Sequence, residues 1–330
     1  VTAFAAASRG MAEAERIIDL ARSLAWQTRF AQMLGQTELV SQLVEENRTI
    51  LDLPTLSNVD GRSARALVLL QLGASSAGQD PTVAQEFYAE SLALFRELDE
   101  HWFAAEVQMG LAHLCLTQGD FAGQRAHVEA ALGTYRALGH VRGTASALSL
   151  LADIDSYSGR LISGLNLGLE SLAAFRTLED PIGTATCLSR LGYTYMNLGD
   201  VVNARQVINE SVTIFAGIGA RRDEAIAYVF LCAAELMTGA YQQAHVQAQR
   251  ALDLAMTLND QLVLGVALGF EGWAALSLGD LARALETLRR AVAMTELTGA
   301  TMDGARAHAI LARAQRANGQ DRQARAHCYQ

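Results

Sequence analysis

The sequence predicts an all-α protein, a right-handed α-solenoid of stacked antiparallel helix pairs. Three observations predict this fold: a helix-favouring composition, a fixed repeat period, and two amphipathic stripes in each period. Half of the 330 residues are apolar, mostly Ala and Leu, the aromatic share is 6%, and proline occurs three times. A chain so rich in Ala and Leu and so poor in Pro favours helices over strands.

The repeat period is 40 residues. One column of glycines keeps this spacing: Gly119, Gly159, Gly199, Gly239, Gly279 and Gly319. A column of leucines keeps it too, with one exception at Glu271: Leu111, Leu151, Leu191, Leu231 and Leu311. Small residues form a third column (Ser91, Ala131, Ser171, Ser211, Ala251 and Ala291), and aromatic residues a fourth (Phe95, Tyr135, Phe175 and Phe215). A fixed period of this length indicates a solenoid.

Each period divides into two helices. In residues 180–198 one stripe is formed by Leu188, Leu191, Gly192 and Tyr195, and in residues 201–215 by Ala204, Ile208, Ser211 and Phe215. Both sets have the spacing of a helical face. Small residues at Gly192 and Ser211 allow the helices to approach closely. A single pair cannot bury both stripes, so each repeat must stack on its neighbours.

The N-terminal part of the chain keeps the pattern less strictly. We expect helices at 11–24 and 37–53 without the strict period, and at 63–77 and 82–98 with it. The segment 52–61 is the clearest break, and we expect a loop inside one array there, with a change of subdomain as the alternative. The expected organisation is therefore divergent helical repeats over 1–59 and regular repeats over 60–330, in one continuous solenoid. The chain begins without Met and stops within an expected helix, so we expect a piece of a longer polypeptide.

Composition also bears on compartment, cofactors and partners. The net charge is −9 and the basic residues are all Arg without a clustered block, which argues against direct nucleic-acid binding. No apolar run is long enough to span a bilayer. The cysteines are far apart, which indicates apolar filler in a reducing, cytoplasmic compartment, and His113 and Cys115 point in different directions on a helix. We therefore expect no metal and no cofactor.

The Gly199-Asp200 pair has three interpretations: a phosphate loop, an acidic catalytic site, or helix punctuation. A Walker A loop needs a Lys, which the chain lacks, and Asp200 would repel an anion. We therefore expect Gly199 to end one helix in the left-handed conformation, and Asp200 to cap the next helix.

These columns resemble the tetratricopeptide repeat. Leu191, Gly192 and Tyr195 fit its first helix, and Ala204, Ile208 and Ser211 fit its second. The resemblance covers roughly residues 60–330. This sequence departs from the family pattern in three ways. Asp155 and Glu235 stand in the column of Tyr195, Gln124 and Gly164 stand in the column of Ala204, and the period is longer than the commonest form.

A narrower resemblance lies in the phrases at 91–100, 131–140 and 171–180. They are similar to the long-period repeats of large bacterial signalling proteins, including the STAND-type ATPase regulators of transcription. There such an array follows an ATPase module, so the resemblance implies a sensor or scaffold role in signal transduction.

The tetratricopeptide resemblance also implies where a partner binds, because first helices line the concave groove of that family. The residues expected in the groove are Glu106, Met109, His113, Ser149, Asp153, Tyr157, Arg190, Tyr193, Asn197, Phe230, Met237, Trp273 and Arg313. Mixed polar and aromatic residues at stacked positions suit a peptide, a protein partner or a small-molecule inducer.

We therefore expect a non-catalytic binding module. The alternative is a helical-repeat enzyme that uses Asp153, Asp155 and His113 for acid–base chemistry. Asp155, Glu235 and Glu271 stand in columns that are otherwise apolar. Each is either a buried acid with a raised pKa or an acid paired with a neighbouring Arg, and we favour the pairing. Self-association through the end repeats is a third possibility.

Overall fold

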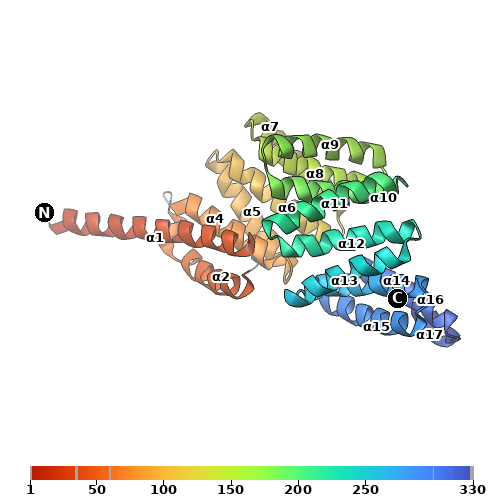
Figure 1. The fold of residues 1–330 in the computed structure, drawn as a ribbon. Helices are drawn as coiled ribbons and strands as arrows, with labels where there is room; N and C mark the ends of the chain where they lie inside the picture. Colours follow the sequence, from red (N-terminus) through yellow and green to blue (C-terminus); the bar gives the residue numbers. More distant parts are fainter. Residues whose placement is uncertain (1, 34–35, 59–60, 300, 328–330) are drawn as a thin grey trace. The chain divides into compact units, whose positions relative to one another are not determined.

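The computed structural model describes residues 2–33, 36–58, 61–299 and 301–327, and none of these residues forms a strand. The chain divides into two compact units, residues 1–151 and 152–330. In each unit antiparallel helices are joined by short turns and stack as pairs, as the labels along the ribbon in Figure 1 show. The predicted all-α solenoid is therefore confirmed.

The first unit contains a long N-terminal helix followed by shorter ones. Its helices are α1 (Thr2–Met33), α2 (Thr37–Leu51), α3 (Pro54–Ser57), α4 (Arg62–Ser76), α5 (Pro81–Glu97), α6 (His101–Thr117) and α7 (Phe121–Ala137), and it includes most of α8 (Val141–Tyr157). The helix expected at 11–24 is confirmed and is part of the longer α1. The loop expected at 52–61 was wrong in part, because residues 54–57 form the one-turn helix α3. Pro54 starts α3 because a proline at the first helical position gives up no hydrogen bond.

The second unit continues the regular pairs. Its helices are α9 (Leu161–Thr177), α10 (Pro181–Asn197), α11 (Val201–Ile218), α12 (Arg221–Met237), α13 (Tyr241–Thr257), α14 (Gln261–Ser277), α15 (Leu281–Thr298), α16 (Thr301–Ala317) and α17 (Asp321–His327). From α4 onward the even-numbered helices are the first of each pair, and the odd-numbered helices are the second.

The turns within and between pairs use left-handed backbone. Every glycine of the 40-residue column has a positive φ, between 73° and 84°. Turns between pairs alternate: glycine takes the left-handed position at Gly139, Gly219 and Gly299, and Asp99, Glu179 and Asn259 take it in the other turns. The prediction that Gly199 ends one helix and Asp200 caps the next is confirmed. Gly199 has a φ of 78°, and Asp200 accepts a hydrogen bond from the N–H of Asn203 at 3.1 Å.

Asp200→Ala is expected to lower the free energy of unfolding by about 1 kcal/mol, because it removes the acceptor that caps α11. Guanidinium denaturation followed by circular dichroism measures this change. Asp200→Ser is the control, since it keeps an acceptor oxygen and should stay within about 0.5 kcal/mol of the parent. Equal losses in the two variants would show that the acceptor oxygen is not what stabilises the start of α11.

Size-matched pairs fill the interior between the two helices of a repeat. In the second unit two such pairs are Gly192–Ile208 and Gly272–Leu288. A Cβ added at Gly192 would lie 2.3 Å from Cγ1 of Ile208, and one added at Gly272 would lie 2.4 Å from Cγ of Leu288. A large second-helix side chain therefore occupies the space that the glycine leaves open.

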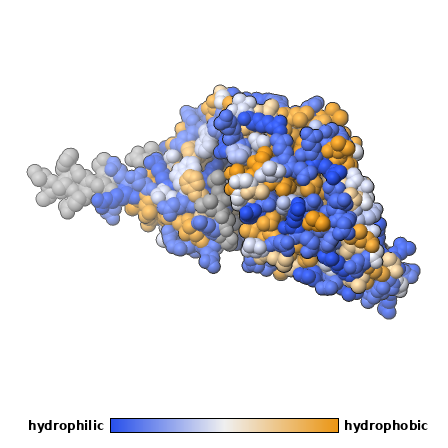
Figure 2. Space-filling model, in the orientation of Figure 1, coloured by the Kyte–Doolittle hydropathy of each residue, from blue (hydrophilic) through white to orange (hydrophobic). Residues whose placement is uncertain are grey.

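The surface mixes hydrophobic and hydrophilic residues, as Figure 2 shows for one face. Val202 and Ile162, for example, are 79% and 63% exposed. Among the described residues, no helix has the length and apolar character needed to cross a membrane.

Candidate ligand-binding groove

A pocket of about 430 Å³ opens among the first helices of the second unit. Its volume lies in the range of ligand-binding cavities, about 300–1,000 Å³. The lining comes from the end of α8 and from α10, α12, α14 and α16: Tyr157, Tyr193, Met196, Asn197, Arg222, Ile226, Val229, Phe230, Ala233, Met237, Leu262, Val263, Val266, Phe270, Trp273, Asp303 and Arg306. These residues are called the pocket below.

The hollow follows from one small residue between two large ones. Tyr193, Ala233 and Trp273 occupy the same column on the three successive first helices α10, α12 and α14, and all three line the pocket. Because Ala233 carries only a methyl group, the space between the two aromatic side chains stays open.

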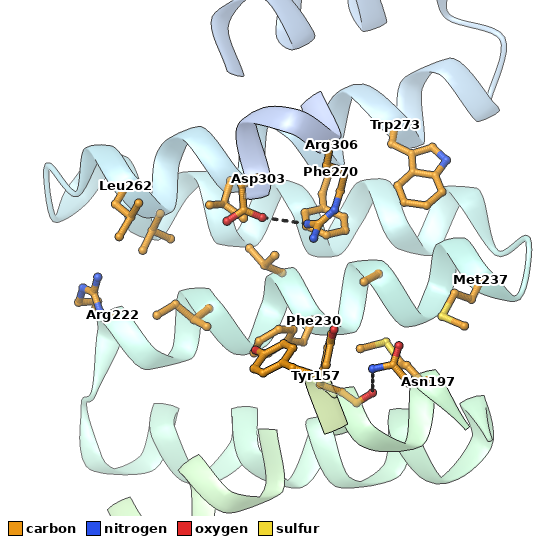
Figure 3. A pocket seen from close by; sticks show the side chains of 17 residues that line it. Tyr157, Asn197, Arg222, Phe230, Met237, Leu262, Phe270, Trp273, Asp303 and Arg306 are labelled. Atoms are coloured by element: carbon orange, nitrogen blue, oxygen red, sulfur yellow. Dashed lines mark hydrogen bonds and ion pairs between the residues drawn. The ribbon is translucent and has the colours of Figure 1, made fainter. Parts of the chain in front are cut away.

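The pocket runs along the two helices α12 and α14. Figure 3 shows Arg222 and Leu262 at one end and Met237 and Trp273 at the other. The inner lining is apolar, because α12 contributes Ile226, Val229 and Phe230 and α14 contributes Val266 and Phe270. A helical stripe from each helix therefore forms the walls.

Aromatic rings gather at both sides of the pocket. The Tyr157 and Tyr193 ring centroids lie 5.1 Å apart, and the stacked Phe270 and Trp273 rings lie 6.4 Å apart. The Arg306 guanidinium lies over the Phe270 ring, 4.9 Å from its centroid, in a cation–π contact. Such rings give large apolar contact surfaces at low conformational cost.

The charged groups of the pocket and its border are held in ion pairs. Arg222 contacts Asp260 at 2.7 Å, and Arg306 contacts Asp303 at 3.0 Å. Next to Tyr157, Arg190 forms an ion pair with Asp153. These pairs leave the apolar walls as the dominant feature of the pocket.

The surroundings of Tyr157 and Asp153 disfavour negative charge. Burial raises the pKa of Tyr157 to about 12, with smaller contributions from Asp153 and Tyr193, although half of the Tyr157 surface is still exposed. Burial also raises the pKa of Asp153 above its usual value, against the opposing effect of Arg190. Desolvation is thus the main influence on both groups.

Six of the residues expected in the groove line the pocket: Tyr157, Tyr193, Asn197, Phe230, Met237 and Trp273. Asp153 and Arg190 pair beside it. Arg313 is exposed on α16 and does not line it.

The expected groove residues of the first unit lie elsewhere. Glu106 is held by Arg29 at 2.7 Å and by the Tyr135 hydroxyl at 2.6 Å, so it fastens α1 to α6 and α7. His113 is exposed, Met109 is half-buried and Ser149 is buried.

Several pocket residues were not anticipated from the sequence. They include Ile226, Val266, Phe270 and Arg306. The signal was present, because Ile226 and Phe230 lie four residues apart on one face of α12, and Val266 and Phe270 repeat that spacing on α14.

The three acids in apolar columns are paired, as favoured. Arg160 contacts Asp155 at 2.8 Å, and Arg205 contacts Glu235 at 2.9 Å. Glu271 is fully buried, and it contacts Arg283 and the ring Nδ1 of His245, both at 2.8 Å. Among the described residues, no group of His, Cys, Asp and Glu is arranged to hold a metal ion.

Comparison with solved structures decides the fold family. A signal transduction ATPase with numerous domains from Pyrococcus horikoshii, which has a tetratricopeptide repeat sensor, superposes with a TM-score of 0.58 at 14% identity. The match covers 94% of this chain and 50% of that one. The chain has a tetratricopeptide-like fold.

Two further structures share this tetratricopeptide-like fold. A Rap protein complexed with Competence and Sporulation Factor matches with a TM-score of 0.69 at 16% identity, covering 96% of this chain and 95% of that one. Aspartyl phosphate phosphatase F from Bacillus subtilis matches with a TM-score of 0.65 at 12% identity. The match covers 88% of this chain and 73% of that one. The sequence matches no protein-family model and no curated protein.

Proposed function

We propose that the second unit is a non-catalytic binding module that holds an apolar segment of a peptide or protein partner in the pocket. The pocket carries this proposal, because it combines five aromatic rings, an apolar floor and a volume in the range of ligand sites. Buried aromatic contacts of this kind supply most of the energy at protein interfaces.

The structural neighbours support a signalling role by analogy of fold. One was solved in complex with Competence and Sporulation Factor, and another carries its tetratricopeptide repeats as a sensor. We propose that this chain likewise serves as the sensor or scaffold of a larger, cytoplasmic bacterial signalling protein.

The two carboxylates that the enzyme alternative would use are both held in ion pairs. Asp155 is buried, bonded to Arg160 and accepts a hydrogen bond from Ser163, and Asp153 is bonded to Arg190. A general acid or base has to reach the proton that it transfers, and these carboxylates are occupied by their own neighbours.

A peptide-display selection tests the proposal. Random 12-residue peptides are selected on the full chain, and their Kd is measured by fluorescence anisotropy. Trp273→Ala and Tyr193→Ala are each expected to raise the Kd about ten-fold or more, because each removes an aromatic wall of the pocket. The helical circular dichroism should stay unchanged.

Val202→Ala is the matched control, because Val202 is 79% exposed on α11 and lies outside the pocket. Its Kd should equal that of the parent. Recovery of no peptide, or peptides that bind both pocket variants normally, would contradict the proposed function.

A further inference from the structure

The charged side chains among the described lining residues are Arg222, Asp303 and Arg306, and each has an opposite charge beside it. The pair between Arg306 and Asp303 joins residues three apart on α16, and the guanidinium also covers the Phe270 ring. Arg222 is bonded to Asp260, whose other carboxylate oxygen accepts from the Val263 N–H at the start of α14. The charge of each arginine is therefore balanced by a carboxylate of the chain itself.

An incoming ion would meet charges that are already balanced. A carboxylate that approaches Arg222 or Arg306 would also meet the negative charge of Asp260 or Asp303, and a charge buried against the apolar walls without a partner is costly. An incoming cation would meet the positive charges of Arg222 and Arg306, and the Arg306 guanidinium already covers one of the five aromatic rings, that of Phe270. The inner walls, formed by residues such as Ile226, Phe230 and Val266, offer contact to apolar groups only.

The part of the pocket next to α8 and α10 also disfavours a charged ligand group. Desolvation there raises the pKa of both Tyr157 and Asp153, so the environment penalises negative charge. The lining also offers neutral hydrogen-bonding groups: the phenols of Tyr157 and Tyr193, the indole N–H of Trp273 and the side-chain oxygen of Asn197.

We infer that the group entering this pocket is uncharged and aromatic or branched aliphatic, and that the pocket selects against both anions and cations. This inference rests on the proposed function and names the chemistry of the part that the pocket takes. A neutral side chain of a peptide and a neutral small molecule share that chemistry, and the peptide selection described above distinguishes these two sources.

Three probes of one shape test the selectivity on the full chain. N-phenyl-1-naphthylamine, which is uncharged, reports occupancy by its fluorescence. It is displaced by 1-naphthalenemethanol, 1-naphthoate or 1-naphthalenemethylammonium, which are neutral, anionic and cationic. The neutral alcohol is expected to displace the reporter at a concentration about ten-fold lower than either ion. Equal or better displacement by an ion would overturn the inference.

Two variants localise the effect. Ala233→Trp fills the pocket and is expected to abolish reporter binding, whereas Val202→Trp places the same side chain on an exposed position and should leave it intact. Reporter binding that survives in Ala233→Trp, or that is absent from the parent, would overturn the inference.

Asp303→Asn is a further test, because this variant is expected to bind an anion more tightly than the parent does. Arg306 then loses its carboxylate partner and becomes available to an anion, so 1-naphthoate is expected to bind about ten-fold more tightly than it binds the parent. An unchanged affinity would show that ion pairing does not set the preference.

The two proposals can fail separately. Selected peptides that need Trp273 but carry a charged anchor would leave the proposed function standing and overturn the inference. Neutral probe selectivity without any selected peptide would overturn the peptide function and leave the selectivity of the pocket established.

Discussion

Ile208→Ala is expected to lower the free energy of unfolding by about 2–5 kcal/mol, one of the two largest effects we predict for this chain. Ile208 is fully buried on α11, and its side chain fills the space above Gly192 of α10. Truncation leaves a cavity that the close-packed repeat cannot collapse around. Guanidinium denaturation followed by circular dichroism measures the loss. Val202→Ala on the exposed face of the same helix should change stability by less than about 0.5 kcal/mol.

A double-mutant cycle tests the pairing itself. Gly192→Ala alone introduces a methyl group against Ile208, and the clash costs about 1–3 kcal/mol, partly offset by about 1 kcal/mol of helix propensity. In Gly192→Ala/Ile208→Ala the new methyl group occupies vacated space. The double variant should therefore be more stable than the sum of the single losses by about 0.5–3 kcal/mol. Additive losses would show that the two positions do not share one volume.

Arg283→Leu is expected to destabilise the second unit by about 3 kcal/mol, because it removes a cation from a buried carboxylate. Glu271 is fully buried, whereas 41% of the Arg283 side chain is exposed. The loss stays at the lower end of the range for broken buried pairs because His245 still contacts the carboxylate at 2.8 Å. Chemical denaturation measures it.

Glu271→Leu should have a much smaller effect, within about 1 kcal/mol of the parent. The column that contains Glu271 is otherwise leucine, and Arg283 can turn its charge to solvent once the acid is gone. Arg176→Leu is the matched control, since Arg176 and its partner Glu210 are both well exposed and such pairs contribute about 0–1 kcal/mol. Equal losses for Arg283→Leu and Glu271→Leu would contradict this asymmetry.

The fold could be predicted from the sequence because its signals are local and repeated. The left-handed turn at Gly199, the cap at Asp200 and the stripe through Leu188 and Leu191 each follow from short-range chemistry, and the 40-residue period repeats them. The N-terminal part lacks that repetition. There the length of α1 and the helical turn at Pro54 depend on packing within the first unit, which the sequence pattern does not encode.

The pocket could be predicted only in part. Tyr193 and Trp273 stand in one column of the expected groove, and both line the pocket. Arg306 and Asp303 were missed because they approach it from α16, three first helices beyond α10. Which repeats converge on one site depends on the curvature of the stack. Small rotations between neighbours set that curvature, and no single residue reports it.

The alternating turns between pairs give this array a longer module than its 40-residue period. Glycine takes the left-handed position at Gly139, Gly219 and Gly299, 80 residues apart, and Asp99, Glu179 and Asn259 take it in between. The aromatic walls Tyr193 and Trp273 are also 80 residues apart, on either side of Ala233. Removing the repeat that carries Ala233 would break this alternation of turns and bring Tyr193 and Trp273 to neighbouring positions in the column. Four helices, not two, are therefore the unit by which a protein engineer could lengthen or shorten the array while keeping both the alternation of its turns and the pocket.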